Sequence, residues 1–202
     1  MELSQVTFAG PPIGDGYSVP HGVPPNLVAL LRQINGFVQF RGGLHLRGLC
    51  SEPNWHSLEA VMDGELALYR GYRAIKETDV PFAQDCVADQ FILRDGIVHK
   101  LYSETGDLQS LDLKLPGFFA AIDADPVAFL EMHPLLQFER EGGSLKPGEV
   151  IHVYPPFCTK ESGNGVSLRA MPVEEALVYL PAFARQISAL RDGEEFQIKV
   201  GP

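Results

Sequence analysis

Cysteine and histidine side chains are the first places to look for chemistry, because a thiolate is a nucleophile and an imidazole is a base near neutral pH. The chain has three cysteines, Cys50, Cys86 and Cys158, and six histidines, at positions 21, 45, 56, 99, 133 and 152. No two histidines are three or four residues apart, so no helix offers a ready pair of metal ligands. The cysteines are odd in number and lie outside any C-x-x-C pattern, which indicates reduced thiols that serve as small buried hydrophobic residues. We therefore expect neither a metal nor a cofactor.

A thiol enzyme is the alternative use of these residues. It would pair Cys50 or Cys158 with one histidine, and Cys50 and His56 are only six positions apart. We favour structural roles, because free cysteines are inert unless their surroundings lower the pKa. His99 and His152 fall inside predicted strands, where we expect hydrogen-bonded structural imidazoles. The chain has no phosphate-binding loop, no G-x-G-x-x-G, no H-E-x-x-H and no G-x-S-x-G motif.

Carboxylates and aromatic residues allow a binding role instead. Asp85 and Asp89 flank Cys86, and either hold a loop through backbone hydrogen bonds or present charge to a partner; we favour the loop role. The aromatic residues Trp55 and Tyr102 are expected at the core and its rim, and they become interface anchors if they are exposed. The D-x-D that ends at position 125 is interpreted as a helix cap and not as a metal site.

The first of the elements expected to position these residues is a glycine- and proline-rich N-terminal segment. Residues 1–22 contain so many glycines and prolines that we expect an extended arm lying on the domain, with no helix or central strand. A helix is predicted over 24–34, where apolar residues recur at i, i+3, i+4 and i+7 before an Asn-Gly stop. The alternation of leucine with histidine or arginine over 44–49 predicts a half-buried strand.

Asp95-Gly96 predicts a β-hairpin of strands 90–94 and 97–102, because a type I′ turn requires positive φ at both central residues. Neither face of this hairpin is wholly polar, which favours a central position in a sheet that is covered on both sides. The two-residue loop pairs Leu93 with Val98, Phe91 with Lys100, Ile92 with His99 and Gln90 with Leu101.

The last third of the chain predicts further helices and strands. Two short helices are expected between residues 115 and 138, followed by a strand in EVIHVYPP. A helix over 172–191 is expected to be kinked or divided by Pro181, and FQIKV, residues 196–200, to form a final strand.

Length and charge limit the function classes. The chain has 202 residues, 26 acidic against 16 basic, and a formal net charge of −10. This charge argues against a nucleic acid or an anionic membrane as the primary partner. The opening residues show no charged segment followed by an apolar one, and no stretch is long enough to span a membrane, so we expect a cytoplasmic protein of one domain.

The order of motifs resembles the SUKH superfamily, which includes bacterial immunity proteins and a fungal regulator of cell-wall assembly. The similar segments are PPNLVALLRQINGFVQFRGGLHLRGL (24–49), VPFAQDCVADQFILRDGIVHKLYSETGD (80–107) and ADPVAFLEM (124–132). The resemblance implies an α+β fold with a twisted, mainly antiparallel sheet and helices packed against it. It covers residues 24–138 and leaves a C-terminal extension, from about 139, on a domain spanning 23–202. The loop before the hairpin lacks the glycines that the family pattern has there.

The resemblance implies no shared catalytic residues. It favours a non-enzymatic cytoplasmic protein, a monomer or weak homodimer, that neutralises a bacterial toxin, such as a nuclease, by occlusion. A negative protein would be steered to the basic cleft of such a toxin. The alternatives are the Cys/His hydrolase and a regulatory scaffold without a toxin partner. The candidate partner-binding residues are Asp85, Asp89, Trp55, Tyr102, Glu104 and Asp107.

Overall fold

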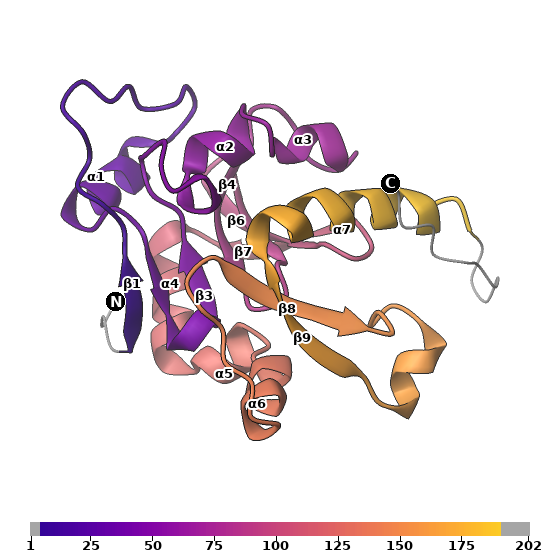
Figure 1. The fold of residues 1–202 in the computed structure, drawn as a ribbon. Helices are drawn as coiled ribbons and strands as arrows, with labels where there is room; N and C mark the ends of the chain where they lie inside the picture. The colour runs from indigo at the N-terminus through magenta and orange to yellow at the C-terminus, as the bar shows by residue number, and fades with distance from the viewer. Residues whose placement is uncertain (1–4, 191–202) are drawn as a thin grey trace.

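An antiparallel sheet is the centre of the fold, as Figure 1 shows in a computed structural model that describes residues 5–190. Within this range its seven strands lie side by side in the order of the chain. The predicted α+β class with a mainly antiparallel sheet is therefore confirmed. The strands are β1 (Val6–Ala9), β2 (Phe37–Gln39), β3 (Leu44–Leu46), β4 (Val80–Asp85), β5 (Gln90–Arg94), β6 (Ile97–Tyr102) and β7 (Asp107–Leu113).

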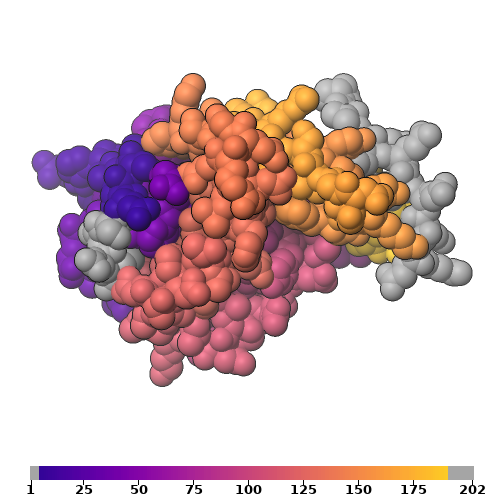
Figure 2. Space-filling model, turned by 90° about the horizontal axis from the view of Figure 1, so that it is seen from below, coloured from indigo at the N-terminus to yellow at the C-terminus, as the bar shows by residue number. Residues whose placement is uncertain are grey.

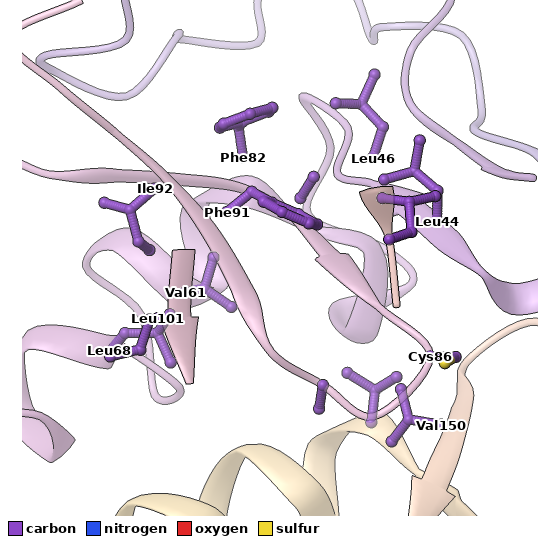
Figure 3. Close-up of a cluster of buried hydrophobic side chains, with 14 of the residues drawn as sticks. Leu44, Leu46, Val61, Leu68, Phe82, Cys86, Phe91, Ile92, Leu101 and Val150 are labelled. Carbon is purple, nitrogen blue, oxygen red and sulfur yellow. The ribbon is translucent and has the colours of Figure 1, made fainter. Parts of the chain in front are cut away.

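Helices cover both faces of this sheet. Phe118 of α4 packs against Phe82 and Phe91 on one face, with ring centroids 5.3 and 4.8 Å apart. On the other face, Leu101 and Ile92 point toward α2 and α3 (Figure 3). The helices are α1 (Pro25–Gln33), α2 (Leu58–Met62), α3 (Leu68–Gly71), α4 (Leu115–Ala124), α5 (Pro126–Phe129), α6 (His133–Arg140) and α7 (Val173–Ile187), with short 3-10 turns at Phe40–Gly42, Asn54–His56 and Lys160–Asn164.

The hairpin of β5 and β6 has the predicted register. All four predicted cross-strand pairs are present, and both Asp95 and Gly96 have positive φ, at 51° and 78°. The hairpin lies between β4 and β7, and both of its faces carry buried residues. The central position predicted from its mixed polarity is confirmed.

The strand predicted over 44–49 is shorter than expected and is buried on both faces. His45 and Arg47, expected to face solvent, are 4% and 0% exposed. The reason is that other parts of the chain cover the face on which these side chains lie: the ring of His45 packs against those of Trp55 and His56. Arg47 donates hydrogen bonds to the Pro81 carbonyl and to the side chains of Gln84 and Gln90, and His45 Nε2 lies 2.9 Å from His56 Nδ1. The alternation of residue types does not reveal these buried contacts.

The N-terminal arm has no helix or central strand within residues 5–22, as expected, and it contains β1, a strand at the edge of the sheet paired with β2. Two other expectations are corrected by the structure. The helix α7 continues through Pro181 and is not divided there, and its proline is buried against Gly71 of α3. Cys158 is exposed, whereas Cys50 and Cys86 are buried as expected. The predicted strand FQIKV lies outside the described residues.

The C-terminal part belongs to the same hydrophobic core. β8 (Glu149–Tyr154) and β9 (Ser167–Pro172) form an antiparallel pair, and α7 packs against both. The Ile151 amide donates a 2.7 Å hydrogen bond to the Cys86 carbonyl, and Val150 lies beside Cys86 (Figure 3). From below, the segment leading from α6 into β8 crosses the middle of the molecule (Figure 2). This arrangement brings β8 and α7 against the loops that precede β5 and follow β6, at the end of the hairpin opposite its Asp95-Gly96 turn.

Candidate functional site

The main cavity of the described residues lies where the C-terminal part meets the sheet. It has a volume of about 260 Å³ and is open to solvent on one side. The turn after β6, strand β8, the segment that follows β8, and helix α7 supply its walls. Much of the wall is apolar and comes from Ile151, Val153, Met171, Ala176, Leu180 and Phe183.

Aromatic rings and carboxylates interrupt this apolar wall. Tyr102, His152, Phe157 and Tyr179 all line the cavity, and the rings of His152 and Tyr179 meet edge to face with centroids 5.5 Å apart. A carboxylate from Glu104 stands beside them. Aromatic faces next to carboxylates are suited to bind cations and hydrogen-bond donors.

Glu104 fixes the segment that closes the cavity after β8. Its two carboxylate oxygens accept hydrogen bonds from the backbone amides of Phe157 and Cys158, at 3.1 and 2.9 Å. The thiol of Cys158 also donates to this carboxylate. Partial burial and then the charge of Glu104 raise the pKa of Cys158 to about 12, so the thiol is neutral. A nucleophilic cysteine needs the opposite shift.

His152 is the imidazole of the cavity, and it is not arranged as a base for this thiol. Among the described residues no hydrogen bond joins His152 to Cys158. Burial lowers the pKa of His152, the charge of Glu104 acts to raise it, and the charge of Arg169 acts to lower it. The two residues of a thiol enzyme therefore share one cavity, but the groups around them keep the thiol protonated.

The slow reaction of Cys158 is a testable consequence. We expect the native thiol to react with iodoacetamide at pH 8 at least about tenfold more slowly than a cysteine in an unstructured peptide, because little thiolate is present. Mass spectrometry of the alkylated peptides measures the rate at each cysteine. The Glu104→Gln variant removes the carboxylate charge and should react faster. Alkylation of Cys158 faster than that of the free peptide would contradict this assignment and favour the thiol enzyme.

Asp89 brings a second carboxyl group to the inner wall of the cavity. Its Oδ1 accepts a 2.7 Å hydrogen bond from the Ser103 amide, and its Oδ2 lies 3.4 Å from the ammonium of Lys100. Burial and the charge of Asp85 raise the pKa of Asp89 to about 8. A cation in the cavity would favour its ionised form.

Lys100 is the centre of a buried ion cluster behind this wall. It is 3% exposed and lies 3.0 Å from Asp85 and 2.5 Å from Glu131 in addition to Asp89. Burial alone would lower the pKa of Lys100, but the charges of Asp85 and Asp89 raise it above its usual value. Three carboxyl groups thus surround one ammonium. Because burial raises the pKa of both Asp85 and Asp89, the cluster holds protons as well as charge near neutral pH.

The structure brings only part of the predicted partner-binding set together. Tyr102, Glu104 and Asp89 line the cavity, and Asp107 is exposed at the start of β7, paired with Tyr102 in the β6–β7 register. Asp85 is 1% exposed and accepts hydrogen bonds from the amides of Val87 and Asp89, which is the loop role that was favoured. Its side chain is therefore buried and does not line the main cavity.

Trp55 lies in a different cluster. Its ring packs against Phe8 and against the imidazoles of His45 and His56, with centroids 4.9 to 5.4 Å apart. It does not line the main cavity. Trp55 therefore fastens β1 to the sheet and is separate from the group around Tyr102.

No family model, curated protein or solved structure matches the chain. The function is therefore argued from the chemistry of the cavity. Within residues 5–190, no group of three or more histidine, cysteine, aspartate or glutamate side chains is placed to hold a metal ion. No helix in this part of the chain combines the length and apolar character needed to cross a bilayer.

Sequence reasoning did not single out the aromatic side chains that the C-terminal part contributes. Phe157, Tyr179 and Phe183 come from segments beyond the SUKH resemblance. Phe157 lies in the segment after β8, and the pattern of α7, which holds the other two, indicates only a helix with a buried face. No local motif marks them, because the cavity exists only where this helix packs against the turn after β6. The only signal in the sequence that could have pointed to this cavity was the presence of a thiol and an imidazole, Cys158 and His152, both of which line it.

Proposed function

We propose that this protein is a non-enzymatic cytoplasmic binding protein whose partner is a basic protein domain. Occlusion of the partner's functional surface would be its mechanism, as expected of an immunity protein that neutralises a toxin. The resemblance to the SUKH superfamily and the net charge of −10 support this proposal.

The acidic, aromatic cavity is the observation that carries the proposal. Glu104 and Asp89 lie among aromatic and aliphatic side chains in an open cavity, and Asp107 extends the negative charge along β7. Buried aromatic anchors surrounded by charged residues are typical of protein-binding surfaces. The thiol of Cys158 is neutral, and within residues 5–190 no hydrogen bond joins it to His152. Both observations argue against catalysis here.

Isolation of the partner from the source organism tests the proposal. A tagged wild-type chain and the double variant Glu104→Gln/Asp107→Asn should be used in parallel, with Glu77→Gln, an exposed residue before β4, as the control. We expect a basic protein to be retained by the wild type and the control and to be depleted by the double variant. The purified partner should bind with a Kd that rises at least about tenfold from 50 to 300 mM salt.

The binding measurement also separates the alternatives. If the partner is a toxin, its activity should fall in proportion to the complex formed. Binding without any toxin activity would support the regulatory scaffold. A partner that binds the double variant as well as the wild type, with no dependence on salt, would contradict the proposed acidic surface.

A further inference from the structure

The cavity has a volume suited to a single side chain, and we call it the socket. Its volume of about 260 Å³ exceeds the roughly 150 Å³ of an apolar cavity that accepts benzene, and it is smaller than the usual range for sites that hold drug-sized ligands or cofactors, about 300–1,000 Å³. A single long or aromatic side chain from a partner would therefore fill it.

The charge of the cavity selects among such side chains. Asp89 presents a carboxyl group from the inner wall, with 12% of its side chain exposed, and Glu104 presents another at the segment after β8. The ammonium of Lys100 is shared among three carboxyl groups, so the Asp89 carboxyl group can ionise to pair with a second cation that enters the cavity. A negative side chain would be repelled by Glu104, and a neutral one would gain nothing from either carboxyl group beyond a hydrogen bond, whereas a cation would pair with both.

The aromatic groups favour a planar cation. Tyr102, Phe157 and Tyr179 provide ring faces or edges beside the carboxyl groups. A guanidinium is planar, stacks on aromatic rings and binds carboxylates through two donors, whereas the ammonium of lysine is a strongly hydrated point charge. The aliphatic stem of arginine would contact Ile151 and Leu180 in the apolar wall.

We propose that this cavity is the binding site for an arginine side chain of the basic partner. The inference rests on the proposed function for the source of the arginine. The preference of the cavity for a guanidinium is measurable without the partner.

N-acetyl-L-arginine amide is the probe, and N-acetyl-L-citrulline amide, which has almost the same shape but no charge, is its control. Both are titrated into the full chain, and chemical shifts are followed by NMR. We expect the arginine probe to shift the signals of Tyr102, His152 and Tyr179 with a Kd of about 1 mM, and the citrulline probe to bind at least about tenfold more weakly. Glu104→Gln and Asp89→Asn should each weaken arginine binding, and the exposed control Glu77→Gln should not.

The possible results distinguish this inference from the proposed function. Equal binding of arginine and citrulline would overturn the inference and show a site that is only apolar. The absence of any shift at 20 mM arginine probe would also overturn it, as would a cavity filled by a second copy of the chain. If a basic partner still binds in those cases, the proposed function stands without the socket. Arginine binding with no basic partner would leave the socket and remove the proposed function.

Asp89 requires a folding check, because its carboxyl group also contacts Lys100. The far-UV circular dichroism and Tm of Asp89→Asn must match those of a folded chain before its affinity is interpreted. Leu180→Trp gives a second test that leaves both carboxyl groups in place, since the larger ring occupies the cavity. Unchanged arginine binding by a folded Leu180→Trp variant would place the site elsewhere.

Discussion

Replacement of Lys100 by methionine is expected to lower the free energy of unfolding by about 3–5 kcal/mol at pH 7. The ammonium is buried and pairs with Asp85 and Asp89, which are also buried, and the methionine would remove this positive charge from beside both carboxyl groups. Urea unfolding followed by circular dichroism measures the loss. A decrease in Tm of roughly 2–4 °C for each kcal/mol should accompany it.

The pH dependence of this loss follows from the direction of the pKa shifts. Burial raises the pKa of both Asp85 and Asp89, and removal of Lys100 removes an opposing charge. The folded variant therefore holds protons that the unfolded chain releases above about pH 4, so its stability falls as the pH rises. The difference between wild type and Lys100→Met should be larger at pH 8 than at pH 5.

Two further variants decide whether charge is the cause. The exposed pair Arg41–Glu139 is the control, and Glu139→Gln should cost less than about 1 kcal/mol. The triple variant Lys100→Met/Asp85→Asn/Asp89→Asn should recover much of the lost stability, because the buried charges are removed together. A loss for Lys100→Met that is independent of pH and not recovered by the triple variant would contradict the electrostatic explanation and indicate a packing defect.

The hairpin and the first helix could be predicted from the sequence because their signals are local. A type I′ turn at Asp95-Gly96 fixes the register of β5 and β6, and an apolar stripe between prolines and Asn-Gly defines α1. The strands β7 and β9 were not predicted. β7 exposes many of its residues and β9 alternates only weakly, so their pairing with β6 and β8 is decided by those neighbours and not by their own composition.

The candidate site could be predicted only in part, for a similar reason. Tyr102 and Glu104 follow a predictable hairpin, and their place at its end is a local property. Whether Asp85 faces solvent or the interior depends on the packing of Lys100 from β6, which is separated from β4 by β5. The aromatic side chains of α7 reach the cavity through contacts between segments some 75 residues apart, which spacing along the chain does not encode.

A second large effect is expected on acidification, because His45 and His56 are buried as a hydrogen-bonded pair. The Nε2 of His56 lies 2.9 Å from the Asn35 carbonyl, which only accepts, so this nitrogen carries a proton and donates. In the neutral ring Nδ1 is then an acceptor, and His45 Nε2, 2.9 Å away, donates to it. His45 Nδ1 consequently has no proton and, among the described residues, no partner. Both imidazoles are neutral.

The pKa shifts give the sign and the window of this effect. Burial lowers the pKa of His56 from 6.5 to about 4, and burial together with the charge of Arg47 lowers that of His45 well below its usual value. Below about pH 6.5 the unfolded chain therefore binds protons at these two histidines that the folded chain does not bind, and the free energy of unfolding falls as the pH drops. His56 alone accounts for about 3 kcal/mol between pH 7 and pH 4.

Variants are needed to isolate this effect, because Asp89 contributes with the opposite sign: its raised pKa favours the folded state as the pH falls. His56→Gln and His45→Gln should each reduce stability at pH 7.5, and each should flatten the decrease between pH 7 and pH 5. His21→Gln, at an exposed position, should change neither value. NMR of the imidazole nitrogens should show the Nε2-protonated form for both buried rings, with no titration above pH 5. If either ring titrates near pH 6.5, or if the histidine variants keep the full decrease, the neutral pair is not what makes the fold sensitive to acid.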